Sequence, residues 1–235
     1  HVVVIAGDMP LIRGETLKTL IATHERENAA ATLATTVLED PAGYGRIVRD
    51  QAGRLKGIVE HGDCTPEQLA IREVNPSYYC FRGQPLLEAL GQIRPDNAKG
   101  EYYITDVLTV LIERGYRVAA VAAVPPEDAT GINSRRELAT VSRIMQDRLQ
   151  ERWMRDGVTI VDPASTWIDA RARIGPDTVI MPFTCLVGPV RIGHGCRIGP
   201  FAHVAGDVVL QPGSCVGPFE NRQRIGPPAT PRGGG

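Results

Sequence analysis

Aliphatic residues recur at every sixth position along much of the second half of the chain, and small or β-branched residues recur four positions after the first eight of them. The aliphatic positions are Ile168, Ile174, Ile180, Leu186, Ile192, Ile198, Val204, Leu210 and Val216, and the small positions are Ala172, Thr178, Thr184, Val190, Cys196, Ala202, Val208 and Ser214. A fixed period of this length is typical of a parallel β-helix, in which the aliphatic side chains point inward and the small ones occupy the corners. The pattern therefore predicts a β-helix.

The first part of the chain follows a different pattern. The all-apolar run Val2–Ala6 is typical of a strand that is buried on both faces of a parallel sheet. Apolar positions at helical spacing over Glu15–Asn28 predict a helix, and Ala31–Leu38 predicts the next strand. This β-α-β alternation indicates the α/β class with a parallel sheet.

Between residues 43 and 81 the pattern changes to short strands that are separated by turn residues, which predicts an antiparallel insertion beside the main sheet. The predicted strands are Arg46–Arg49, Leu55–Val59, Ile71–Val74 and Tyr78–Phe81. Helices over Gln84–Leu90 and Tyr103–Arg114 and a strand over Arg117–Val124 follow.

A long helix is predicted from about Ser134 to Arg155. Ser134 is its expected N-cap, and Glu137 completes a capping box. We therefore expect an α/β domain over residues 1–133, a linker helix over 134–157 and a β-helix over 158–221. Residues 222–235 have lost the period in favour of Pro and Gly, and we expect them to be a disordered tail.

Composition excludes several classes of function. The 235 residues carry a net charge of −1 and are 23% charged and 43% hydrophobic, so we predict no nucleic-acid partner. No apolar run is long enough for a membrane span or a signal peptide, and we predict a cytoplasmic protein. The five cysteines are scattered, and the histidines lack the spacing of a catalytic triad or a zinc site. We therefore expect reduced thiols and no metal cluster.

The segment Gly7-Asp8-Met9-Pro10-Leu11 directly follows the first predicted strand. In open α/β sheets, ligands bind in the crevice outside the carboxyl ends of the strands. A carboxylate at Asp8, beside a glycine that allows close approach, suits Mg²⁺ and its preference for hard oxygen ligands. Taken alone, Asp8 is equally well explained as a cap of the turn into the next helix.

Further motifs occur in order along the chain. They are Gly43-Tyr44-Gly45-Arg46-Ile47, Ile58-Val59-Glu60-His61, Glu73-Val74-Asn75, Gly100-Glu101-Tyr102-Tyr103-Ile104-Thr105-Asp106 and Gly131-Ile132-Asn133. With Asp8 and the hexapeptides, they make the chain resemble the bacterial bifunctional family of N-acetylglucosamine-1-phosphate uridylyltransferases and glucosamine-1-phosphate acetyltransferases. The resemblance extends from the start of the chain to about residue 218 and is specific for the uridylyltransferase half.

The resemblance implies a Rossmann-like nucleotidyltransferase domain followed by a short left-handed β-helix, with three hexapeptides per turn and about three turns. The implied reaction joins UTP to N-acetylglucosamine 1-phosphate, giving UDP-N-acetylglucosamine for peptidoglycan synthesis and pyrophosphate. It implies Asp8 and Asn133 as catalytic ligands of Mg²⁺. With these two, Ala6, Gly7, Gly45, Glu60 and Asn75 would line the substrate site.

The chain also departs from the family pattern. The family's glycine-rich phosphate loop and its lysine precede the strand that ends in Gly-Asp. We therefore expect this chain to be the C-terminal part of a longer product, with negligible activity alone. Gly62 stands where the family usually has a lysine. The pair Pro76-Ser77 after Asn75 also differs from the family pattern. Both departures bear on which sugar the site prefers.

The hexapeptides give a second set of expectations. They stop near Asn221, and neither His194 nor His203 has the context of the family's acetyltransferase histidine, so we predict that acetyl transfer is absent. We expect the β-helix to form a homotrimer. Two alternatives stay open: a pyrophosphorylase for another sugar 1-phosphate, and an acyltransferase or scaffold chain built on the hexapeptides.

Overall fold

The computed structural model describes residues 1–97 and 99–224. The chain forms two compact units, one from His1 to Val141 and a second that begins at Ser142. Each is described by itself.

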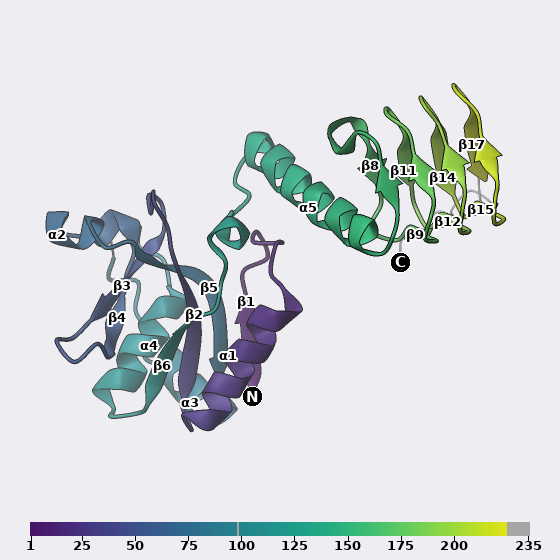
Figure 1. Cartoon of the computed structure of the whole chain (residues 1–235). Helices are drawn as coiled ribbons and strands as arrows, with labels where there is room; N and C mark the ends of the chain where they lie inside the picture. Colours follow the sequence, from purple (N-terminus) through teal and green to yellow (C-terminus); the bar gives the residue numbers. More distant parts are fainter. Residues whose placement is uncertain (98, 225–235) are drawn as a thin grey trace, which may run out of the picture. The chain divides into compact units, whose positions relative to one another are not determined.

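The first unit is built on one six-stranded mixed sheet (Figure 1). Its strands are β1 (Val2–Ile5), β2 (Ala31–Val37), β3 (Gly45–Arg49), β4 (Leu55–Val59), β5 (Glu73–Phe81) and β6 (Val118–Ala122). The order is β4-β3-β5-β2-β6, and β1 also pairs with β5. Among these strands, β2 and β6 form the parallel pair, and the other pairs are antiparallel.

The prediction of a parallel sheet is therefore wrong in one respect. Strands β1 and β2 run in the same direction, as a β-α-β unit requires, but β5 lies between them and runs against both. The side chains of Val2, Val3 and Ile5 are 40%, 41% and 48% exposed, so β1 is also not the strand buried on both faces that its apolar run predicts. An apolar run indicates a strand but carries no information on the direction of its neighbour.

Strand β5 replaces two predicted short strands. Asn75, Pro76 and Ser77 are turn-forming types, and for that reason the sequence pattern divides there. The chain instead continues through them, with Ser77 at φ 61° and an irregularity in the pairing with β2 between Ala34 and Thr36. The first part of β5 pairs with β3 and the last part with β1.

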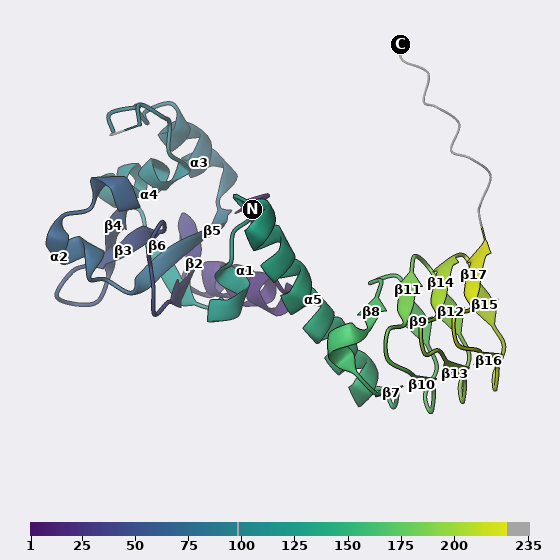
Figure 2. The same ribbon diagram turned by 90° about the horizontal axis from the view of Figure 1, so that it is seen from above.

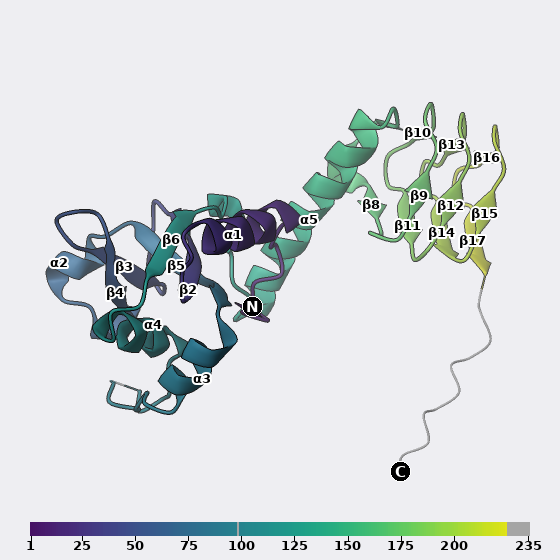
Figure 3. The same cartoon turned by 90° about the horizontal axis from the view of Figure 1, so that it is seen from below.

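Helices cover both faces of this sheet, with α1 on one face and α3 and α4 on the other (Figures 2 and 3). Their bounds are α1 (Gly14–Arg26), α2 (Pro66–Leu69), α3 (Gly83–Leu90) and α4 (Ile104–Glu113), and short 3-10 turns occur at His61–Asp63 and Pro126–Ala129. Because side chains alternate along a strand, neighbours on β5 belong to different cores. Tyr79 packs with the α3 and α4 residues, whereas Tyr78 and Cys80 pack with Leu20 of α1.

Helix α5 (Arg135–Arg155) begins near the predicted Ser134. The Ser134 hydroxyl accepts a hydrogen bond from Glu137 N at 3.2 Å, as a capping box requires. The Glu137 carboxylate accepts from Asn133 N at 2.6 Å, and a hydrogen bond from the Ser134 backbone also helps to lower the pKa of Glu137. The boundary between the two units falls inside this helix. The residues of α5 from Ser142 onward therefore belong to the second unit.

The last turns of α5 cover the first turn of the β-helix. The Gln146 side chain donates to Ile168 O at 2.8 Å and accepts from Ile168 N at 2.9 Å, as a neighbouring strand would. Gln150 donates to Thr166 O at 2.8 Å, and Trp153 packs in the β-helix core. These contacts satisfy backbone groups that the first turn would otherwise leave without partners.

The second unit is the β-helix that the sixfold period predicts. Its short parallel strands are β7 (Thr159–Ile160), β8 (Trp167–Ile168), β9 (Arg173–Ile174), β10 (Val179–Ile180), β11 (Cys185–Val187), β12 (Arg191–Ile192), β13 (Arg197–Ile198), β14 (His203–Gly206), β15 (Val209–Leu210), β16 (Cys215–Val216) and β17 (Asn221–Arg224). They form sheets of four, four and three strands, which Figure 2 shows stacked turn upon turn. Ile168 pairs with Leu186, eighteen positions later, so three hexapeptides close a turn. This is consistent with the predicted left-handed helix.

The β-helix has about four turns instead of the expected three, because strands lie beyond the regular period at each end. Ile160 of β7 pairs with Ile180, which is twenty positions later instead of the regular eighteen. Because of these two additional residues, β7 does not fit the six-residue period and was not predicted. At the other end, Arg222 of β17 pairs with Val204 and occupies an aliphatic position of the lattice. The predicted tail thus begins too early, since residues 222–224 form a strand. The rest of that tail, residues 225–235, lies outside the described residues.

One corner of the β-helix carries a ladder of aromatic rings. Phe183, Phe201 and Phe219 lie eighteen residues apart, each in the left-handed backbone region, and their side chains are exposed. The rings stack with centroid separations of 4.8 and 5.1 Å. Successive turns therefore repeat in both backbone and side-chain conformation.

Candidate functional site

A pocket of about 430 Å³ lies beyond the carboxyl end of β1 in the first unit. Five separate segments line it, and each carries one of the motifs identified in the sequence. The lining residues are Ala6, Asp8, Met9, Ala42, Gly43, Tyr44, Gly45, Glu60, Asn75, Ser77, Thr130, Gly131, Asn133 and Glu137. The fold thus brings together residues that are more than a hundred positions apart in the sequence.

Backbone hydrogen bonds hold these segments next to one another. Ile132 N donates to Asp8 O at 2.9 Å, which fixes the segment carrying Asn133 beside Asp8. Ala6 N donates to Ser77 O at 3.2 Å and so joins the end of β1 to β5. The Tyr44 hydroxyl donates to Ala129 O at 2.5 Å, and burial raises the pKa of Tyr44, so it remains a donor at neutral pH. Because of these bonds the wall of the pocket exists before any ligand binds.

Six of the seven predicted site residues line this one pocket: Ala6, Asp8, Gly45, Glu60, Asn75 and Asn133. Gly7 does not line it. A Cβ added at Gly7 would meet no atom within 4 Å, so within the described chain nothing close to this position requires a glycine.

Gly45 is required by its own neighbours in the protein. A Cβ at this position would lie 2.9 Å from Ile58 Cγ2 and 3.3 Å from both carboxylate oxygens of Glu60. Its glycine therefore lets β3 and β4 pair closely while Glu60 reaches the pocket. The simple explanation as a turn glycine does not fit, because Gly45 begins strand β3.

Glu60 is half-buried at the end of β4. Burial raises the pKa of its carboxyl group, and the Thr105 hydroxyl opposes this effect by donating to Glu60 Oε1 at 3.2 Å. Thr105 belongs to the Gly100–Asp106 motif, so this motif acts on the pocket through Glu60. A carboxylate with free acceptor positions is suited to hydroxyl groups of a ligand.

Asn75 has a structural role in addition to its place on the wall. Its Nδ2 donates to the Tyr79 hydroxyl at 2.7 Å, and its Oδ1 accepts from Ser77 N at 3.0 Å. These bonds hold β5 through its irregular segment. An amide can form further hydrogen bonds from each of its polar ends, so Asn75 retains capacity for a ligand.

The pocket is acidic. Asp8, Glu60 and Glu137 line it, and none of the described lining residues is Lys or Arg. Hydrogen bonds from Asn133 N and from Ser134 lower the pKa of Glu137, which keeps that carboxylate ionised. Such a site repels a phosphate group unless a cation binds between them. The Asp8 carboxylate and the Asn133 amide oxygen are hard donors that fit Mg²⁺.

Sequence reasoning missed Glu137 as a site residue, because its place three positions after Ser134 already explains it as a helix cap. Ser77 was missed because the turn pattern predicts only the backbone conformation at this position and does not indicate a binding site. The acidic character of the pocket appears only when the segments are brought together.

The fold and the site together define a class of protein: an α/β domain with an acidic ligand pocket at a strand end, followed by a hexapeptide-repeat β-helix. Comparison with known families agrees with both parts. The Nucleotidyl transferase family matches residues 1–151, and the Bacterial transferase hexapeptide (six repeats) family matches residues 171–206 and 189–219. The chain belongs to the nucleotidyl transferase family.

Curated relatives include several proteins named Bifunctional protein GlmU. That of Thermobifida fusca is 49% identical over 187 residues, which are 80% of this chain and 39% of the relative. Those of Pelotomaculum thermopropionicum and Streptomyces avermitilis are 48% and 49% identical, over 78% and 80% of this chain and 40% and 39% of their own lengths. The chain thus spans about two fifths of the length of these relatives.

The structure also bears on the predictions about the cysteines and about membrane spans. All five cysteines are free thiols, as predicted. Among the described residues, no helix is long and apolar enough to cross a membrane.

Proposed function

We propose that the pocket beyond β1 belongs to a Mg²⁺-dependent sugar-nucleotide pyrophosphorylase that transfers UMP from UTP to N-acetylglucosamine 1-phosphate. The products are UDP-N-acetylglucosamine and pyrophosphate. The observation that carries the proposal is a pocket with three carboxylates and no Lys or Arg among its described lining residues, in a chain of the nucleotidyl transferase family. The names of the relatives support it by similarity.

The charge of the pocket supports the need for a cation. Both substrates are phosphate anions, and carboxylates at Asp8, Glu60 and Glu137 repel them. Asp8 and Asn133 would hold the ion, because the Ile132–Asp8 hydrogen bond keeps their segments adjacent. Bound Mg²⁺ supplies positive charge that neutralises the phosphates and the departing pyrophosphate.

The reaction needs no general base. A phosphate oxygen of the sugar phosphate attacks the α-phosphorus of UTP, a new P–O bond forms, and the bond to the bridging oxygen breaks as pyrophosphate leaves. Since the attacking oxygen is already anionic, the protein has to align two anions and exclude other orientations. The rigid wall of hydrogen-bonded segments is suited to that task.

Three residues of the wall would position the nucleotide sugar. Glu60 accepts hydrogen bonds from sugar hydroxyls with the acceptor positions that Thr105 leaves open. Asn75 uses its remaining hydrogen-bonding capacity on the acetamido or hydroxyl groups. Gly45 provides the space in which Glu60 lies. Asn75 is therefore both a positioning and a binding residue.

Calorimetric titration of the chain with UDP-N-acetylglucosamine tests the proposal. Binding is expected with Mg²⁺, to be lost when the ion is chelated, and to be lost in Asp8→Asn. The control is Asp207→Asn, which removes an exposed carboxylate from the β-helix and should bind as the parent does. Binding that is equally strong in Asp8→Asn, or without Mg²⁺, would overturn the proposed metal site.

A panel of nucleotide sugars tests the choice of substrate. UDP-N-acetylglucosamine should bind more tightly than UDP-glucose or GDP-mannose, and a preference for one of the latter would favour a pyrophosphorylase for another sugar. We also propose that the β-helix forms a homotrimer, which light scattering of the purified chain would detect. The cytoplasmic location and the lack of acetyl transfer stay predictions.

A further inference from the structure

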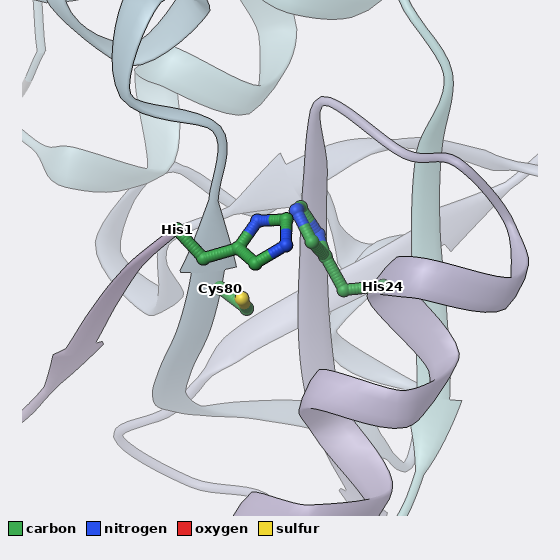
Figure 4. A group of neighbouring side chains, drawn as sticks. All are labelled: His1, His24 and Cys80. Atoms are coloured by element: carbon green, nitrogen blue, oxygen red, sulfur yellow. The ribbon is translucent and has the colours of Figure 1, made fainter.

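Three potential metal ligands lie together on the α1 side of the sheet, away from the acidic pocket. They are His1 ahead of β1, His24 near the end of α1, and Cys80 in β5 (Figure 4). Their ligand atoms all lie within 4.8 Å of one another. The rings of His1 and His24 meet edge to face, with centroids 4.7 Å apart.

His24 is buried and yet lacks one hydrogen-bond partner. Its side chain is 1% exposed, and its Nδ1 lies 3.0 Å from the Thr32 hydroxyl. The other ring nitrogen, Nε2, has no partner in the described structure. A buried polar atom without a partner is costly, so such an atom calls for an explanation. A ligand bound at Nε2 would provide one.

We propose that His1, His24 and Cys80 form a Zn²⁺ site. Two imidazole nitrogens and a sulfur are the donors that zinc prefers, and three protein ligands leave a fourth position for water or another group. The Glu25 carboxylate lies close to this group, with its Oε1 3.8 Å from His1 Nε2. The donors lie within 4.8 Å of one another, and a movement of the exposed His1 side chain can bring them to the separations of a tetrahedral site.

The surroundings favour the metal-binding form of His24 but not that of Cys80. Burial lowers the pKa of His24, with a smaller contribution from Arg82, so its imidazole is neutral and keeps a lone pair. The Thr32 hydroxyl next to Nδ1 fixes the ring orientation, as outer-shell partners of metal-bound histidines do. Burial raises the pKa of the Cys80 thiol, so zinc binding must release its proton.

The site would serve the stability of the first unit and does not depend on the proposed function. It shares no residue with the acidic pocket, and its nitrogen and sulfur donors suit zinc where the pocket's oxygens suit magnesium. Zinc would join the start of β1 to α1 and β5. Strand β1 pairs with β5 alone among the described strands, so an added link at its first end would hold it in place.

Cobalt titration tests this proposal directly, because Co²⁺ replaces Zn²⁺ and absorbs in the near ultraviolet when bound to a thiolate. The chain is prepared without a polyhistidine tag, which would bind the same ions. One equivalent of Co²⁺ should produce the thiolate band, and one equivalent of Zn²⁺ should remove it. Cys80→Ser should lose the band, whereas Cys215→Ser, which changes an exposed cysteine of the β-helix, should keep it.

Because Cys80 is buried and its replacement can disturb folding, a variant of the exposed ligand His1 provides a second test. His1→Ala changes an exposed residue and leaves the buried core intact. It should weaken Zn²⁺ binding at least about tenfold, because even the loss of a residue that only supports a metal ligand weakens metal binding by about that much. Zn²⁺ should also raise the melting temperature of the parent chain more than that of His1→Ala. A folded parent chain without a thiolate band, or a band that persists in Cys80→Ser, would show that no such site exists.

Discussion

Gly193 offers the sharpest test of how the turns of the β-helix pack. A Cβ at this position would lie 2.5 Å from Pro212 N, 2.8 Å from Pro212 Cα and 2.9 Å from Pro212 Cδ. These atoms belong to the backbone and ring of the next turn and cannot rotate away. Gly193→Ala should therefore force two turns apart at a point where Gly193 N donates to Leu210 O at 2.9 Å.

The size of the effect follows from opposing contributions. Overpacking of a rigid core costs about 1–3 kcal/mol. Weakening the hydrogen bond to Leu210 adds about 1 kcal/mol. Replacing glycine by alanine restricts the unfolded chain and returns about 0.4–1 kcal/mol. The expected net loss in the free energy of unfolding is therefore about 1–3.5 kcal/mol.

Gly217→Ala is a matched control, because Gly217 follows Val216 as Gly193 follows Ile192. Among the described residues, the atom nearest to a Cβ at Gly217 is Glu220 Oε2, at an ordinary 3.8 Å. Urea unfolding followed by tryptophan fluorescence reports the difference. Both tryptophans, Trp153 and Trp167, lie in the second unit, so the signal is specific for it. Equal stability of the two variants would show that the turns separate freely, contrary to the packing argument.

Two further predictions concern charged pairs. Arg13→Ala should destabilise the first unit by about 2–3 kcal/mol, because Arg13 donates to the buried Asp128 carboxylate at 2.5 and 2.9 Å. The control Arg114→Ala removes the exposed ion pair between Arg114 and Glu88, whose atoms are 3.7 Å apart, and should cost less than about 1 kcal/mol. Urea unfolding followed by circular dichroism measures both losses. In the β-helix, hydrogen bonds from Arg171, assisted by Gly188 N, hold the pKa of Asp169 far below its ordinary value. A depressed carboxyl pKa stabilises the fold above the unfolded pKa of about 4 and loses this contribution as the pH falls, so the stability difference between the parent chain and Asp169→Asn should shrink between about pH 6 and about pH 3. A difference that is constant over this range would contradict the assignment.

The β-helix was predictable because its signal is local and periodic. Each turn contributes aliphatic residues at fixed spacing, and the observed eighteen-residue register repeats that spacing. The ends were not predictable from the period. Two additional residues separate β7 from the lattice, and an arginine replaces the aliphatic residue in β17.

The sheet of the first unit was predicted in its elements but not in its pairing. Hydrophobic patterns located β1, α1 and β2, yet the insertion of β5 between the two strands depends on contacts between distant segments. The site shows the same division. Motifs found Asp8, Glu60 and Asn133, whereas Glu137 and the cluster of His1, His24 and Cys80 depend on the folded arrangement.

The eighteen-residue register has a consequence for how this chain can change in length. Adding or removing three hexapeptides shifts every later residue by one whole turn and returns each side chain to the same face. Any other insertion would rotate the following turns against the stack, unless a corner loop absorbs it, as the two extra residues before β8 do. Each added turn would therefore lengthen the second unit by one strand spacing, about 4.8 Å.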